Sequence, residues 1–302
     1  MIGGAIGGAT RRLGPGATLA AAILVVLALA AAAAPLAERV LGLDAEAVDL
    51  FGRLAPPSAE HLLGTDELGR DLLLRLLYGG RVSLTVGVVA AVAASAIGTA
   101  VGLAAGYLGG RADALLMRFA DGVIALPLLP LLIVLAAVDL TKLGLSPEAA
   151  ASEAVLLGRL VVLVALVGWP TTARLVRAAA LSLRRREFVE AARTLGYSPL
   201  RIAVRHVLPN AAAPILVATT LAVGNVVLFE SVLSFLGLGI RPPTPSWGNM
   251  LTGAQELIWE SPRLAIWPGV LIFATVVSVN LLGDALRDAL DPRSRRRGTG
   301  GE

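Results

Sequence analysis

The chain has 302 residues, of which 56% are hydrophobic and 16% charged, and its mean hydropathy is +0.77. A soluble domain carries about a quarter charged residues, so this composition excludes an ordinary soluble protein and indicates membrane spans. The formal charge is +4, and cysteine is absent, which excludes disulfide bonds, a thiol nucleophile and a cysteine metal site.

Six segments of the chain are long and apolar enough to cross a bilayer, since a spanning helix needs about 20 such residues. Their apolar runs are continuous and do not alternate residue by residue, which indicates helices and excludes the strands of a membrane barrel. The sequence therefore predicts an all-α polytopic membrane protein with six transmembrane helices. In chain order these are residues 17–36, 82–108, 119–138, 154–175, 211–236 and 265–282.

The first and third spans need a closer look, because the first could be a signal peptide and the third contains prolines. The first follows Arg11 and Arg12, and so begins as a secretory signal peptide does. Its apolar stretch exceeds the about 7–15 residues of a signal-peptide core, so we expect a retained helix. The third contains Pro127 and Pro130, and its length still predicts one crossing.

The basic residues indicate how the spans are oriented. With the N-terminus in the cytoplasm, 17 of the 26 basic residues fall on the cytoplasmic side, whereas residues 38–81 hold eight acidic and five basic residues outside. This positive-inside pattern accounts for the basic composition without nucleic acid as a partner. We expect a multi-pass membrane protein with both termini cytoplasmic. The predicted parts are a cytoplasmic tail 1–16, a first helix 17–36, an external segment 37–81, a core 82–290 with a cytoplasmic loop 184–210, and a cytoplasmic basic tail 291–302.

The external segment contains the run "GTDELGRD", which has four charges among eight residues from Gly64 to Asp71. This run predicts a structural cap, with contact to a binding protein as the alternative. His61 lies nearby as a single histidine, which does not make a metal site. We therefore expect no metal in this chain.

Small residues in the second span form one helical face, at Gly98, Gly102 and Gly106. Such a face favours close helix packing, including packing against another subunit, although small residues are also common throughout this chain. At the start of the third span, Asp121 follows Arg118 by three residues, a spacing that predicts a local ion pair.

Two polar residues in the fifth span, Asn225 and Glu230, need partners or a water-filled cavity. They are candidates for lining such a cavity. The alternative is that they form hydrogen bonds between helices.

The polar stretch between the fourth and fifth spans has the local signals of two short helices. No glycine or proline interrupts residues 184–195, and an apolar stripe follows at helical spacing, formed by Phe188, Ala191, Ala192 and Leu195. Gly196 suits a left-handed helix end with positive φ. Ser198 and Pro199 are typical of the cap and first residue of a second helix. That helix is expected to present Ile202 and His206 on one face and to stop at Leu208-Pro209.

The simplest alternative for this stretch is a solvated connector that holds two spans at a fixed angle. One further observation restricts the function of the chain. Its single lysine, Lys142, is followed by Leu143, so the lysine and hydroxyl residue of a Walker A loop are missing. The chain therefore has no P-loop of its own for ATP.

The stretch also resembles a known motif. Glu190-Ala191-Ala192, Gly196 and Leu208-Pro209 are spaced as in the EAA loop of ABC importer permeases. His206 stands where the common form has isoleucine, a departure similar to the dipeptide, oligopeptide and nickel branch. Three more runs resemble signatures of that branch: "LGTDELGRDLLLRLLYGGRVSL" (63–84), "SFLGLGIRPPTPSWGNML" (234–251) and "NLLGDALRDALDPR" (280–293). The chain is similar to the C-type permease of this branch.

This resemblance implies a type I ABC importer fold in a bacterial inner membrane and a transporter of several subunits. It makes Asn225 and Glu230 candidates for the translocation path or its outer gate. The implied partners are a second, B-type permease, two cytoplasmic P-loop ATPase subunits and an extracytoplasmic solute-binding protein. The resemblance implies no catalytic residue or cofactor in this chain, because the partner subunits hydrolyse ATP. The implied ATPase-coupling residues are Glu190, Ala191, Ala192, Gly196, His206, Leu208 and Pro209.

The cargo implied by the resemblance is a di- or oligopeptide, with nickel chelates, glutathione and small glycosides as alternatives. Two other classes fit a polytopic helical protein without a P-loop. A secondary transporter usually has inverted repeats and several ionisable residues near the membrane midplane, and no such repeat is evident here. A membrane scaffold protein predicts unchanged solute flux when the chain is deleted.

Overall fold

Long apolar runs fold as long helices in the computed structural model, which describes residues 14–290. The predicted basic tail 291–302, most of the predicted tail 1–16, and Arg11 and Arg12 lie outside the described residues. Five helices are long: α2 (Pro15–Ala32), α4 (Leu72–Leu108), α8 (Glu153–Leu183), α12 (Ala212–Phe235) and α14 (Arg263–Leu290). The shorter helices are α3 (Ala34–Leu41), α5 (Gly110–Ala125), α6 (Leu128–Ala136), α7 (Pro147–Ala151), α9 (Glu187–Thr194), α10 (Pro199–Ile202), α11 (Leu208–Asn210) and α13 (Trp247–Ala254). Two 3₁₀ turns, Leu50–Gly52 and Leu140–Leu143, and a π-helical turn, Ala203–Val207, complete the described elements.

Within the described residues, the five long helices have the length and apolar composition needed to cross a membrane, and α5 with α6 makes a sixth candidate if the bent pair is one span. Helix α4 begins at Leu72, well before the expected span start at residue 82. The reason is local, since the side chain of Asp71 accepts a hydrogen bond from the Leu74 backbone N–H at 2.8 Å and caps the helix.

The third predicted span, 119–138, is not one straight helix. Helix α5 ends at Ala125, helix α6 begins at Leu128, and their axes differ by 85°. Leu126 between them is extended, with φ −77° and ψ 137°, because a proline at position 127 disfavours helical geometry in the residue before it. The third predicted span is therefore a bent pair of helices and not one straight helix, and this pair is the sixth candidate crossing.

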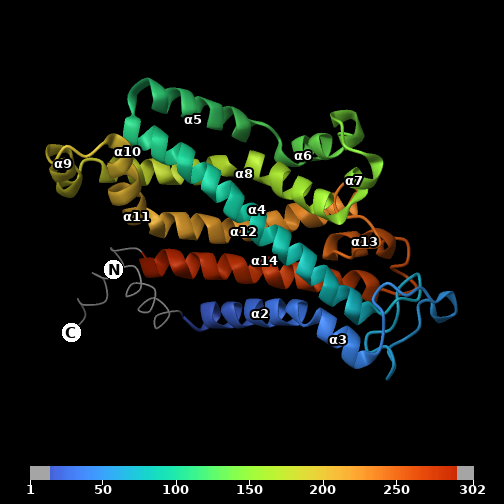
Figure 1. The fold of residues 1–302 in the computed structure, drawn as a ribbon. Coiled ribbons are helices and arrows are strands. Elements are labelled where there is room, and N and C mark those ends of the chain that lie inside the picture. Colours follow the sequence, from blue (N-terminus) through green and yellow to red (C-terminus); the bar gives the residue numbers. More distant parts are fainter. Residues whose placement is uncertain (1–13, 291–302) are drawn as a thin grey trace, which may run out of the picture.

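The long helices run side by side, and the connecting segments gather at the two ends of the bundle (Figure 1). Helices α9, α10 and α11 lie at one end, where α2 begins and α14 ends. Helix α13 and the segment before α4 lie at the opposite end. The loop 184–210 and the described chain ends therefore share one end of the bundle, as the predicted six-span arrangement requires.

Helices α4 and α8 pack closely on each other, and the glycine face of α4 makes this closeness possible. A β-carbon at Gly102 would lie 2.3 Å from the carbonyl oxygen of Ala173, and one at Gly98 would lie 2.5 Å from that of Trp169. At Gly106 the nearest groups are the Ala180 side chain and the Arg177 backbone, both at 2.7 Å. The predicted close-packing face thus serves a contact inside this chain.

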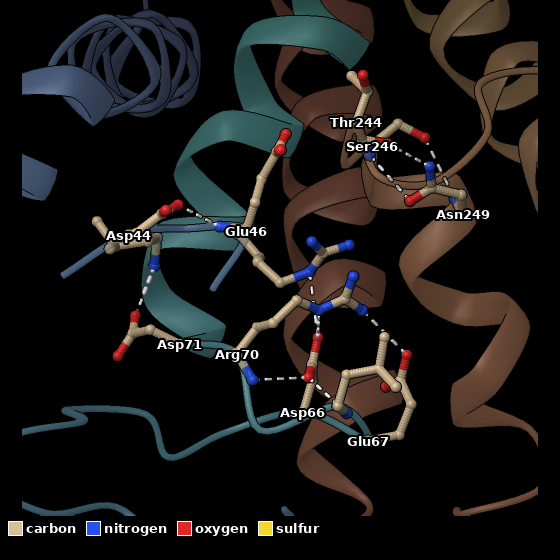
Figure 2. Close-up of polar contacts among 12 residues, drawn as sticks. Asp44, Glu46, Asp66, Glu67, Arg70, Asp71, Thr244, Ser246 and Asn249 are labelled. Atoms are coloured by element: carbon tan, nitrogen blue, oxygen red, sulfur yellow. Dashed lines mark hydrogen bonds and ion pairs between the residues drawn. The ribbon is translucent and has the colours of Figure 1, made fainter. Parts of the chain in front are cut away.

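The run "GTDELGRD" forms a buried ionic cap before α4. Figure 2 shows Asp66 receiving hydrogen bonds from the Arg70 backbone N–H at 3.0 Å and from Arg70 Nε at 2.8 Å. Arg75 Nε lies 3.2 Å from the same carboxylate. His61 Nδ1 lies 3.0 Å from Asp71 Oδ2, so the histidine belongs to this cap. Among the described residues, no group of three histidine or carboxylate side chains is arranged to hold a metal.

Candidate functional site: a loop surface and a cavity

The loop 184–210 is built as two helices joined at a glycine. Helix α9 begins at Glu187, slightly later than the expected start at Arg184. Gly196 then has φ +78°, the left-handed conformation that was predicted for it. The Ser198 hydroxyl accepts a hydrogen bond from the Arg201 backbone N–H at 3.4 Å, and Pro199 opens α10 as predicted. The backbone continues through the π-helical turn and α11, so Leu208-Pro209 does not end the helical course as expected.

One side of this loop packs on the ends of α4 and α8. Val189 and Ala192 of α9, with Ile202 and Val207 after the turn, form a buried cluster with α4 and α8 side chains. The predicted apolar stripe is therefore only partly correct, because Ala192 is buried while Phe188, Ala191 and Leu195 are exposed. Val189, which lies outside that stripe, is fully buried instead. The packing fixes the loop rigidly on two long helices.

The other side of the loop is uncovered, and we call it the loop surface: Glu190, Ala191, Leu195, Gly196 and Leu200. Leu195 is 72% exposed and Leu200 is 74% exposed, although both are large apolar residues. The Glu190 carboxylate forms no ion pair within the described chain. Exposed apolar residues and an unpaired carboxylate on one short loop are typical of a surface that a partner covers.

His206 supports the turn from inside the loop. Its ring stacks on Tyr197 with centroids 5.9 Å apart, and the Arg201 guanidinium lies 5.4 Å from the Tyr197 ring centre. His206 Nε2 is buried and has no hydrogen-bond partner. Ile202, predicted on the same face, is buried while His206 is half-buried. Pro209 is exposed and Leu208 is half-buried at the base of the loop.

A cavity of about 300 Å³ opens among α4, α5, α6, α8 and α12, near the bend between α5 and α6. Its wall is mostly apolar, and Asn225, Thr171 and Thr172 supply the polar side chains. Asn225 is exposed in the described chain. An amide in an apolar cavity both donates and accepts hydrogen bonds, so Asn225 is suited to contact a polar solute.

Glu230, the second candidate for the path, lies outside this cavity. It is fully buried, and its carboxylate accepts hydrogen bonds from Ser83 Oγ at 2.8 Å and from Ser234 Oγ at 2.7 Å. Ser83 Oγ in turn accepts a hydrogen bond from the Trp247 backbone N–H at 3.2 Å. This geometry favours the alternative in which Glu230 joins helices, here α4, α12 and α13.

Two ion pairs link α5 to α8 on the side of the bundle that carries the loop. Arg177 binds Asp113 through two nitrogens, at 2.5 Å from Nε and 2.7 Å from Nη2. Arg174 Nη2 lies 2.5 Å from Asp121, so the local Asp121–Arg118 pair expected from spacing is wrong. Spacing along the sequence gave no sign of these partners, because each pair joins residues more than 50 positions apart. The Arg174–Asp121 pair is exposed, and such pairs contribute only about 0.2–1 kcal/mol to stability.

Comparison with known proteins yields one family and a set of close relatives. A family model described as a binding-protein-dependent transport system inner membrane component matches residues 98–296. The chain is 40% identical over 279 residues to a probable peptide ABC transporter permease of Sinorhizobium fredii, covering 92% of this chain and 89% of the relative. It is 42% identical over 243 residues to a dipeptide transport system permease of Alkalihalophilus pseudofirmus (80% and 75% covered). A glutathione transport system permease of Escherichia coli is 40% identical over 237 residues (78% and 74% covered).

Proposed function

Because the chain belongs to the family of binding-protein-dependent transport system inner membrane components, we propose that it forms half of the path of an ATP-driven importer of di- or oligopeptides. It is a multi-pass permease subunit of an ABC transporter. The observation that carries the proposal is the loop surface, an uncovered set of residues fixed on the ends of two long helices. Its spacing resembles the EAA loop, through which permeases of this kind contact their ATPases.

In this proposal the loop surface docks into a cleft of a cytoplasmic P-loop ATPase. Alanine at 191 allows close approach, Glu190 supplies an unpaired charge, and Gly196 allows the turn between α9 and α10. His206 holds the turn through its stacking on Tyr197, and Leu208-Pro209 form the base of the loop. When two ATPase subunits close on ATP, each docked loop moves as a rigid body with the helices attached to it.

The cargo crosses next to Asn225 in the cavity described above, and a second, B-type permease supplies the other wall of the path. An extracytoplasmic solute-binding protein delivers the cargo. This arrangement requires the loop and both chain ends in the cytoplasm of a bacterial inner membrane, in agreement with the distribution of basic residues.

A peptide cargo is favoured because the relatives named for a cargo carry peptide, dipeptide or glutathione in their names. Glutathione is itself a small peptide derivative and remains the second candidate. None of the three relatives named above is named for nickel chelates or small glycosides, which stay the alternatives that the resemblance implies.

We expect the purified chain in liposomes to hydrolyse no ATP and to transport nothing, because it lacks the Walker lysine. Adding a B-type permease, two P-loop ATPases and a loaded solute-binding protein should give ATP-dependent uptake of a labelled dipeptide or of glutathione. The measurement is uptake with ATP, compared with a non-hydrolysable analogue as the control. ATP-independent uptake by this chain alone would contradict the proposal and favour a secondary transporter.

A further inference from the structure

The loop is continuous with α8, whereas α5 has no direct connection to it. Helix α8 ends at Leu183, and α9 begins four positions later. Helix α5 instead leads into the bend at Leu126-Pro127, and its last residues line the cavity. The α4 end, on which the loop also packs, is joined to α5 by the backbone at Gly109. A movement of α8 that begins at the loop reaches this wall of the cavity through the side chains that join α8 to α5.

Three contacts join these two helices. The Asp113–Arg177 pair lies near the start of α5 and is bidentate. Phe119 stacks on Trp169 with ring centroids 5.8 Å apart, and Ala120 is buried against Trp169 and Ala173. The Asp121–Arg174 pair lies near the end of α5, shortly before the bend. The two ion pairs follow the antiparallel course of the helices, because Asp113 bonds to Arg177 and the later Asp121 bonds to the earlier Arg174.

The ionic and apolar contacts differ in what they fix. Stacked rings and alanine faces allow one helix to slide or rotate on the other at low cost. A bidentate guanidinium–carboxylate pair has a fixed direction and spacing, so it sets the register of two elements. The bidentate Asp113–Arg177 pair therefore sets the register near the start of α5, and the single Asp121–Arg174 contact adds a second ionic point near its end.

From this arrangement we propose that Asp113–Arg177 and Asp121–Arg174 are positioning contacts that make α5 follow α8 when the loop moves, and so reshape the cavity wall at the bend. The inference rests on the proposed docking of the loop on an ATPase. It adds a route by which movement passes from α8 to α5. It also gives the four residues of the two ion pairs a role in coupling the loop to the cavity. The Asp121–Arg174 pair is exposed and adds little to stability, so variants of these two residues are expected to fold.

The chain offers a matched pair of reporter positions. Ile124 on α5 and Leu175 on α8 both line the cavity, and they are 43% and 44% exposed. The native chain has no cysteine, so a single cysteine at either position is a clean probe. The experiment uses the complete transporter in lipid nanodiscs and measures the reaction rate of N-ethylmaleimide with this chain, without nucleotide and with ATP plus vanadate.

In the parent, we expect nucleotide to change the labelling rate at Ile124→Cys and at Leu175→Cys by roughly tenfold, as when a minor conformation becomes the major one. Reversing the two carboxylates, with Asp113→Arg and Asp121→Arg, should abolish the change at Ile124→Cys and leave that at Leu175→Cys. Adding Arg177→Asp and Arg174→Asp restores opposite charges and should restore the response at Ile124→Cys.

An unchanged nucleotide response at Ile124→Cys in the charge-reversed variant would overturn the inference and leave the proposed function intact. Failure of the fourfold swap to restore the response would also count against it, because a register set by ion pairs requires only opposite charges. If neither reporter responds to nucleotide in the parent while the ATPases are bound, the proposed coupling itself fails, and the inference fails with it.

Discussion

Replacing Gly196 by valine is expected to abolish ATP-driven uptake while the chain remains folded in the membrane. Gly196 has φ +78°, where an L-residue costs about 1–2 kcal/mol and a β-branched residue more. No atom lies within 4 Å of the position where a β-carbon would be added, so the effect acts on the backbone and not through a clash. The turn would open, α10 would shift relative to α9, and the loop surface would lose its shape.

The measurement is dipeptide uptake and ATPase association at equal membrane levels of the chain. A loss of about 1.5–3 kcal/mol at the docking surface corresponds to roughly tenfold weaker association or more. Gly196→Asn is the matched variant, because asparagine tolerates the left-handed region, and it should retain most uptake. Gly158→Val controls for the valine itself, since Gly158 has ordinary φ and open space around it. Normal uptake in Gly196→Val would mean that the loop is only a connector.

Replacing Gly102 by valine is expected to prevent the folded bundle from forming. A β-carbon there would lie 2.3 Å from the Ala173 carbonyl oxygen and 2.9 Å from the Val176 side chain. The obstacle is backbone, which a rotamer change cannot relieve, so α4 and α8 must separate. Overpacking of a core costs about 1–3 kcal/mol when neighbours can adjust, and here a whole helix pair has to move.

This second prediction is checked by the yield of monodisperse protein in detergent and by its thermal unfolding. Gly158→Val again serves as the control, because it adds the same side chain to the partner helix α8 where nothing lies within 4 Å. A Gly102→Val protein with parental yield and thermal stability would show that the close α4–α8 approach does not hold the bundle together.

Features that depend on neighbours in the sequence were predictable. Gly196, Ser198 and Pro199 form a left-handed turn and a helix start because each acts on its own backbone or on residues up to three positions away. The bend at Pro127 also has a local cause, because a proline disfavours helical geometry in the residue before it. Applied to Leu126, this rule predicts the bend from the sequence alone. The long apolar runs fold as helices because the backbone must satisfy its own hydrogen bonds in lipid.

Features that depend on which helices meet were not predictable from spacing. Asp121 on α5 bonds to Arg174 on α8 and not to the nearby Arg118. The Glu230 carboxylate accepts a hydrogen bond from Ser83 on α4. The glycine face of α4 was visible in the sequence, but its partner α8 was not, because small residues permit close approach without specifying a partner. The sequence could not distinguish the two candidates for the path. In the structure, Asn225 lines the cavity and Glu230 lies outside it.

Contact between the loop surface and an ATPase is the central claim, and site-specific photo-cross-linking tests it most directly. A photoreactive residue is placed at Leu200, which is 74% exposed at the loop end of the bundle. The control position is Trp259, which is 95% exposed between α13 and α14 at the opposite end. In membranes that contain the complete transporter, Leu200 should form an adduct with a P-loop ATPase subunit and Trp259 should form none. An absence of ATPase adducts at Leu200, or their appearance at Trp259, would contradict the proposed docking and the cytoplasmic position of the loop.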